Sequence, residues 1–147
     1  RMMCVVVAEE AMHSISQAQC ASLPERDIAN HILRFGSVYE HALANNEMLA
    51  TISLDCTKGF NLIGHRWIRR VLLAARCPLN LVNAILSLLD GSEVILFFMR
   101  HRGSPIHLRC GLPQGGPLSP LLFVLVVDPL LCTLNAHRDV DITLGFV

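Results

Sequence analysis

The chain has 147 residues, of which 52% are hydrophobic and 16% are charged. This length suits a single domain, and the hydrophobic content, with no low-complexity tract, excludes an intrinsically disordered protein. The six cysteines lie far apart and form no C-x-x-C pair, which argues against a zinc site or a redox motif and favours buried thiols over disulfides.

Neither a membrane span nor a secretion signal is expected. The longest apolar run, Pro120 to Cys132, is interrupted by Asp128 and is shorter than the roughly 20 residues that a membrane-spanning helix needs. Near the N-terminus, Glu9 and Glu10 follow a short apolar run and no small-residue cleavage site is evident, so a signal peptide is not expected. We therefore expect an intracellular protein that is not secreted, has no transmembrane segment and has no membrane partner.

The formal net charge is zero, but the charges are unevenly distributed. Residues 1–57 carry three basic and seven acidic side chains, a net charge of −4. Residues 58–109 carry eight basic and two acidic side chains, a net charge of +6, and residues 110–147 carry one basic and three acidic side chains, a net charge of −2. The middle third is therefore a candidate for contact with a polyanion, although solvated helix faces would give the same pattern.

The first half of the chain predicts two helices and a strand. The first twenty residues have a weak helical pattern. After Pro24, apolar residues recur at steps of three and four and predict an amphipathic helix that ends near Asn45 and Asn46. The segment MLATISLD, residues 48–55, alternates between apolar and mixed positions, which predicts a strand with Asp55 at its end on the more polar face. In the amphipathic helix after Pro24, the apolar positions are Ile28, Ile32, Phe35, Tyr39 and Ala42.

Two helices are predicted next. Residues 64–76 place Ile68, Val71, Leu72 and Ala75 inward, and four arginines outward, at positions 66, 69, 70 and 76. The second helix follows Pro78, with Asn80 as its cap and Gly91 as its end. Its predicted buried stripe consists of Leu81, Ile85, Leu88 and Leu89.

The last third predicts a hairpin, a buried helix and a further strand. Residues 93–99 and 105–110 flank the turn RHRGS and are predicted to pair. Ser119 as cap and Pro120 at the first helical position open a helix to about Ala136, which is apolar nearly all round and therefore buried. The tail DITLGFV suggests the start of another strand. This order predicts an α+β fold: an antiparallel sheet with helices packed on one face and the other face free for a ligand.

The candidate chemistry lies in two segments, LDCTKGFN at residues 54–61 and GLPQGGPLSP at residues 111–120. An aspartate at the end of a strand, such as Asp55, is most often a cap or turn residue. A phenylalanine just after a strand, such as Phe60, is most often a core residue. The functional interpretation depends on the combination of these two residues with the glycine-rich loop some sixty residues downstream.

These segments resemble the reverse transcriptase family, in particular its non-LTR retrotransposon and group II intron type. The family's Asp-x-x-x-Ala-Phe segment on the first palm strand reads DCTKGF here, at residues 55–60, and its Gln-Gly-x-Pro-Leu-Ser-Pro segment reads QGGPLSP, at residues 114–120. His65 and Trp67 stand where the family has a histidine and a following apolar residue. The likeness covers roughly residues 19–147, and the two segments occur in the family's order and spacing.

The resemblance implies a nucleotide and metal site. Nucleotidyl transfer needs two divalent cations, normally Mg²⁺, held by hard oxygen ligands, and Asp55 is such a ligand. The resemblance adds the backbone carbonyl of Cys56 as a second metal ligand and Phe60 as a ring that excludes a 2′-hydroxyl. Gln114 offers a donor and an acceptor, and Gly115 lets the backbone approach a nucleotide closely, so the loop is expected to lie against the nascent base pair.

Several arginines are candidates for nucleic-acid contact. Arg100, Arg102 and Arg109, in and after the predicted hairpin, are expected to meet the phosphates of an RNA–DNA duplex, together with the outer arginines of helix 64–76. Arg26 resembles an arginine of the fingers, but Glu25 and Asp27 beside it weaken a phosphate-binding role.

The family's third palm motif, an aromatic-Ala-Asp-Asp hairpin that carries the other two essential carboxylates, does not occur in these residues. The chain ends at LGFV, where that motif would be expected, and Gly59 replaces the family's usual alanine. Of the family's three essential carboxylates, only that of Asp55 is found in these residues. We therefore expect that Mg²⁺ is not fully bound and that the chain alone does not polymerise DNA.

We therefore interpret the chain as part of an RNA-directed DNA polymerase of a retroelement. Residues 1–47 would be fingers and palm helices and residues 48–147 the palm with an inserted hairpin, with the thumb missing. The parent enzyme's partners would be an RNA template, a DNA primer and a deoxynucleotide. Two alternatives stay open: a non-catalytic retroelement relic or module that binds RNA or a protein, and an unrelated α+β scaffold.

Overall fold

The computed structural model describes residues 2–20, 23 and 25–136. The chain divides into two compact units. The first consists of residues 1–14 and 58–126, and the second of residues 15–57 and 127–147. The tail DITLGFV, with its predicted strand, lies outside the described residues. Within the described ranges the helices are α1 (Met2–Ala11), α2 (Ile28–Asn45), α3 (Gly59–Leu62), α4 (His65–Ala74), α5 (Leu79–Asp90) and α6 (Ser119–Ala136).

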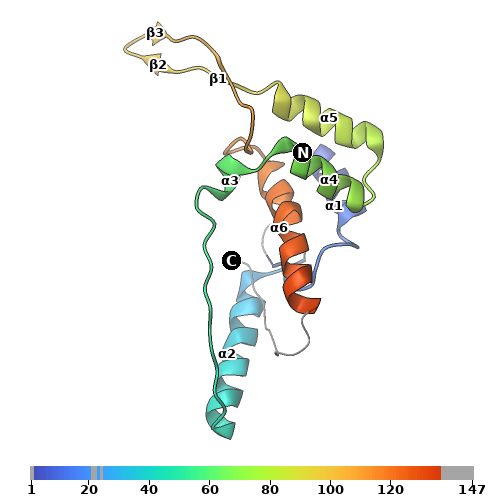
Figure 1. The fold of residues 1–147 in the computed structure, drawn as a ribbon, viewed down its shortest axis with the longest axis vertical. Helices are drawn as coiled ribbons and strands as arrows, with labels where there is room; N and C mark the ends of the chain where they lie inside the picture. Colours follow the sequence, from blue (N-terminus) through green and yellow to red (C-terminus); the bar gives the residue numbers. More distant parts are fainter. Residues whose placement is uncertain (1, 21–22, 24, 137–147) are drawn as a thin grey trace. The chain divides into compact units, whose positions relative to one another are not determined.

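The predicted hairpin is confirmed and forms an arm that extends from the helices of the first unit (Figure 1). Met99 and Arg100 have positive φ values of 43° and 68°, as the central residues of a two-residue hairpin turn do. The turn is therefore tighter than predicted, and two residues of RHRGS, His101 and Arg102, lie in a strand. Two antiparallel pairs make up the arm: β1 (Glu93–Val94) with β4 (Ile106–His107), and β2 (Phe97–Phe98) with β3 (His101–Arg102).

The predicted strand at residues 48–55 is wrong. These residues adopt no regular secondary structure, and the apolar side chains of Met48, Ile52 and Leu54 are exposed. Alternation makes a segment compatible with a sheet, but a strand also needs a neighbour that takes up its N–H and C=O groups. Among the described residues, no strand pairs with this segment. Helices with short antiparallel pairs are consistent with the predicted α+β class.

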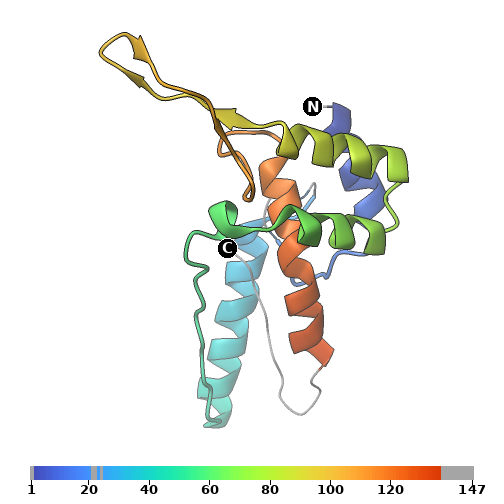
Figure 2. The same cartoon turned by 45° about the horizontal axis from the view of Figure 1, so that its top comes forward.

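The core of the first unit confirms the predicted helix pair. Helices α4 and α5 pack on each other, and α1 lies against them in both Figure 1 and Figure 2. The predicted inward residues of α4 are buried, and α5 buries Val82, Ile85 and Leu89. Gly91 follows α5 as predicted, but the proposed cap Asn80 is wrong, because the helix already begins at Leu79 after Pro78. The predicted stripe residue Leu88 is exposed.

Helix α6 begins and ends where the sequence predicts. It is long and apolar enough to cross a membrane by length and composition alone, and 44% of it is buried. Residues 121–125 are all buried, and so is Asp128, which is the pattern of a core helix. The proposed capping by Ser119 is corrected: its hydroxyl donates to the carbonyl of Pro113 at 2.5 Å, and the carbonyl of Leu118 accepts from Leu122 N–H.

Two helices near the N-terminus differ from prediction in part. α1 ends at Ala11, so the expectation of helix over the first twenty residues is wrong beyond that point. α2 has the predicted extent, with Asp27 capping its start and Asn46 ending it in a left-handed conformation. Most of its predicted apolar face is exposed; of the five residues, only Ala42 is buried.

Candidate functional site

Asp55 and Cys56 lie in the irregular, exposed segment that precedes α3. Both belong to the second unit, whereas Phe60, the glycine-rich loop and the hairpin belong to the first. The approach of Asp55 to Gln114 therefore stays a prediction. The described residues contain no cluster of three or more His, Cys, Asp or Glu side chains that could hold a metal ion, so they do not fit a site for two Mg²⁺ ions. Asp55 and the backbone carbonyl of Cys56 stay predicted ligands.

Phe60 lies in α3 and stacks on Phe123 of α6. The two ring centroids are 4.5 Å apart and the ring planes differ by 9°. Phe60 is half-buried and Phe123 is buried, so the ring has the packing that a core phenylalanine would have. One part of its surface stays open, and a role toward a nucleotide stays a prediction.

The segment around α3 holds the start of the glycine-rich loop through backbone hydrogen bonds. Gly111 N–H donates to the carbonyl of Ile63 and Leu112 N–H donates to the carbonyl of Phe60, both at 2.7 Å. Gly111 has a φ of +89°, and a Cβ at this position would lie 2.8 Å from the carbonyl oxygen of Asn61. Only glycine combines this conformation with so close an approach. We call this contact between residues 60–65 and 111–112 the loop clamp.

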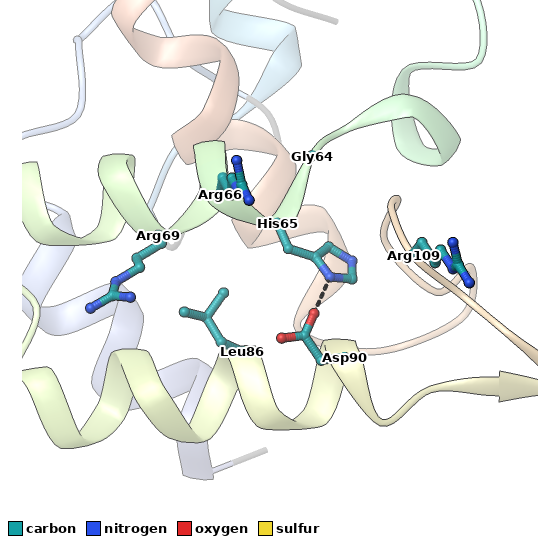
Figure 3. A pocket seen from close by; sticks show the side chains of 7 residues that line it. All are labelled: Gly64, His65, Arg66, Arg69, Leu86, Asp90 and Arg109. Atoms are coloured by element: carbon teal, nitrogen blue, oxygen red, sulfur yellow. Dashed lines mark hydrogen bonds and ion pairs between the residues drawn. The ribbon is translucent and has the colours of Figure 1, made fainter.

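His65 completes the loop clamp from the first turn of α4. Its Nδ1 lies 2.5 Å from a carboxylate oxygen of Asp90, at the end of α5, and its Nε2 lies 3.1 Å from the carbonyl oxygen of Gly111. Both partners are hydrogen-bond acceptors, so a protonated imidazole donates to both and a neutral one donates to only one of them. The ring is buried, and its two contacts tie α4, α5 and the loop together. Figure 3 shows the contact with Asp90.

The loop that follows is closed at its base and open at its tip. Besides the bond from Ser119, the carbonyl of Pro113 accepts from Gly116 N–H at 3.4 Å, and the carbonyl of Gly116 accepts from Ser119 N–H at 3.1 Å. Gln114 and Gly115 are exposed. Gly115 has a φ of +85°, and a Cβ added there would meet no atom within 4 Å. The loop therefore presents the Gln114 amide to the surroundings from a fixed base.

The side chain of Arg26 is engaged within the second unit. Its guanidinium donates to the carbonyl oxygens of Ser16 and Gln19 at 2.5 and 2.7 Å. The carboxylate of Asp128 accepts from Ser16 N–H at 2.9 Å. Arg26 is thus a structural residue that organises the turn before α2, in agreement with the weak phosphate-binding role expected for it.

The surroundings of Cys132 and Cys77 raise the pKa of each thiol and so disfavour the thiolate form. Burial raises the pKa of the Cys132 thiol, and the carboxylate of Asp128 raises it further. Burial also raises the pKa of the Cys77 thiol, with an added contribution from Glu10. Because the thiolate is the nucleophilic form, neither thiol suits nucleophilic catalysis.

The predicted nucleic-acid-binding arginines lie on the surface of the first unit. Arg100 occupies the hairpin turn, Arg102 lies in β3 and Arg109 follows β4. All three are exposed. Arg109 also lines a hollow next to His65 (Figure 3). Their contact with phosphates stays a prediction.

Sequence reasoning misses two residues that hold the loop clamp together, His65 and Gly111, and a third, Asp128, that organises the second unit. The sequence marks His65 only by its likeness to a family position, whereas its bonds to Asp90 and Gly111 join positions far apart in the chain. Nothing in the sequence separates Gly111 from the other loop glycines. Asp128 interrupts an apolar run, and a lone acid in a buried helix is the signal that could have identified it as a buried hydrogen-bonding group.

Comparison with known proteins agrees with the sequence motifs. A family model described as reverse transcriptase (RNA-dependent DNA polymerase) matches residues 2–145. The chain is 36% identical over 95 residues to a retrovirus-related Pol polyprotein from the type-1 retrotransposable element R2 of Popillia japonica, a match that covers 64% of this chain and 13% of that protein.

Two further relatives show similar coverage. The R2 Pol polyprotein of Nasonia vitripennis is 37% identical over 78 residues, or 53% of this chain and 8% of that protein. A 149 kDa protein of transposon TX1 from Xenopus laevis is 26% identical over 117 residues, or 80% of this chain and 9% of that protein. The chain therefore spans only about a tenth of the length of the relatives that it matches.

Proposed function

The chain belongs to the reverse transcriptase family, in its non-LTR retrotransposon branch, and on this premise we propose that it is part of an RNA-directed DNA polymerase. In this proposal residues 1–47 contribute fingers and palm helices, and residues 48–147 contribute the palm with the hairpin as an insertion. The substrates of the whole enzyme would be an RNA template, a DNA primer and deoxynucleotides.

The observation that carries the proposal is the loop clamp. It ties the segment after Asp55, which includes Phe60, to the base of the loop that carries Gln114, by two backbone bonds of 2.7 Å. Backbone hydrogen bonds thus join the two segments on which the family likeness depends. We propose that Phe60 and Gln114 contact the nucleotide from neighbouring positions, with Phe60 resting on Phe123.

We propose that Asp55 and the Cys56 carbonyl are metal ligands of the complete polymerase. In the complete polymerase these two groups would help to hold a divalent cation, which would supply Lewis-acid chemistry for nucleotidyl transfer. Two ions need more carboxylates than these residues supply, so the function proposed for the chain itself is to bind the template–primer duplex and shape the nucleotide site. It is not expected to polymerise DNA.

Binding is tested with a fluorescently labelled RNA–DNA hybrid titrated with the 147-residue chain at several salt concentrations. We expect binding that weakens as salt rises, because phosphate contacts release counterions. Replacing two hairpin arginines, Arg100→Gln with Arg102→Gln, is expected to reduce the slope of log K against log salt by about 2.

The matched control is Arg34→Gln, which removes one exposed charge from α2 in the acidic third of the chain and is expected to leave the slope almost unchanged. A chain that is folded but does not bind the hybrid, or binds it without dependence on salt, would contradict the proposed function.

A further inference from the structure

A hollow of about 450 Å³ lies between α4, α5 and the segment after β4. Its lining includes three arginines, Arg66, Arg69 and Arg109, together with the His65–Asp90 pair and Leu86. Figure 3 shows Arg69 and Arg109 on opposite sides of the His65–Asp90 pair. All of these residues belong to the first unit.

The arginines around this hollow form no ion pair within the described part of the chain, and the one carboxylate in the lining, that of Asp90, is paired with His65. None of the three guanidinium groups has a hydrogen bond or ion pair with a described residue. Residues 58–109 contain eight basic side chains and only two acids. Both acids are paired with histidines, Asp90 with His65 at 2.5 Å and Glu93 with His107 at 3.2 Å. The positive charge is therefore available to an external anion.

The chemistry of the lining favours phosphate over a nucleobase. Leu86 is the only large apolar side chain in the lining, and no Phe, Tyr or Trp ring from the described residues is present there on which a base could stack. Guanidinium groups match phosphate oxygens in geometry and charge. Two of them, on Arg66 and Arg69, are three residues apart and so lie on one face of α4.

We propose that this hollow binds phosphate groups of a nucleic-acid backbone, with Arg66 and Arg69 of α4 acting together with Arg109 at one place. His65 contacts Asp90 in the hollow and the Gly111 carbonyl at the base of the loop. A nucleic-acid strand bound in the hollow would therefore lie next to the loop clamp. The inference deepens the proposed function and rests on it, since it assigns a further surface for the same duplex.

The test compares two double variants on the same helical segment. Arg66→Gln with Arg69→Gln removes two charges from the hollow, whereas Arg70→Gln with Arg76→Gln removes two exposed charges that do not line it. We expect the first pair to weaken binding of the labelled hybrid about tenfold and to reduce the salt slope by about 2. The second pair is expected to change the affinity less than about threefold. Arg66→Lys with Arg69→Lys keeps the charge and should restore most of the affinity.

A second arm separates the backbone from a free anion. Inorganic phosphate is titrated into the chain and into both Gln variants by calorimetry. Equal loss of hybrid affinity in the two pairs, with matching thermal unfolding midpoints, would overturn the inference while the proposed function stands. Phosphate binding that depends on Arg66 and Arg69, with hybrid affinity unchanged by their loss, would overturn it in favour of a free-anion site. Failure of the unaltered chain to bind the hybrid would instead count against the proposed function.

Discussion

Replacing Gly111 by alanine is expected to lower the free energy of unfolding by about 2 to 4 kcal/mol. The residue has a φ of +89°, and the new Cβ would lie 2.8 Å from the carbonyl oxygen of Asn61 and 3.0 Å from that of Phe60. Both neighbours are backbone atoms of the loop clamp, so relief of the contact requires the segment 60–63 and the loop to separate. Urea denaturation measures the loss.

Two other glycines provide matched controls. Gly115→Ala has a similar φ of +85° but meets no atom within 4 Å, so it should cost only the conformational strain, about 1 to 2 kcal/mol. Gly36→Ala lies inside α2 with open space around it and should stabilise by roughly 0.5 to 1 kcal/mol. Equal losses for Gly111→Ala and Gly115→Ala would show that the close approach at Gly111 does not exist.

His65→Ala is expected to lower the free energy of unfolding by about 2 to 3 kcal/mol. The change leaves a cavity beside α4 and removes the partners of the Gly111 carbonyl and the Asp90 carboxylate. Amide hydrogen exchange adds a local readout, because the N–H groups of Gly111 and Leu112 should exchange faster once the loop clamp loosens.

The control for His65 is the other histidine–carboxylate pair. His107 lies 3.2 Å from Glu93, and its side chain is 69% exposed, so His107→Ala should cost less than about 0.5 kcal/mol. If the two histidine variants lose the same stability, or if exchange at residues 111–112 stays slow in His65→Ala, His65 is not part of the loop clamp.

Local patterns in the sequence predict the elements whose stability depends on near neighbours. The spacing of Ile68, Val71 and Leu72 identifies α4, and turn residues between apolar runs identify the hairpin, because in both cases the pattern and its partner lie close in the chain. The same reasoning fails for residues 48–55. Alternation describes which faces a segment could offer, but the partner of a strand can lie anywhere in the chain.

The site is predictable as a set of residues and not as an arrangement. The likeness picks out Asp55, Phe60 and Gln114, yet the contacts that fix the loop come from the carbonyls of Phe60 and Ile63 and from His65. Backbone carbonyls carry no signature in a sequence, and a bond between positions 65 and 111 follows no local period. The arginines of α4 are likewise predicted to face outward, but the hollow that gathers them depends on tertiary packing.

The central claim is that Phe60 and the loop tip at Gln114 face one nucleotide-sized site. Thiol cross-linking tests it most directly, using Phe60→Cys with Gln114→Cys in a chain whose native cysteines are replaced. The positive control is a separate variant that keeps Cys110 and carries Asn61→Cys, because the Sγ of Cys110 lies 3.5 Å from the Asn61 carbonyl. We predict that short bifunctional maleimides link positions 60 and 114 within one molecule. If the control pair is linked and positions 60 and 114 are not, the claim is contradicted.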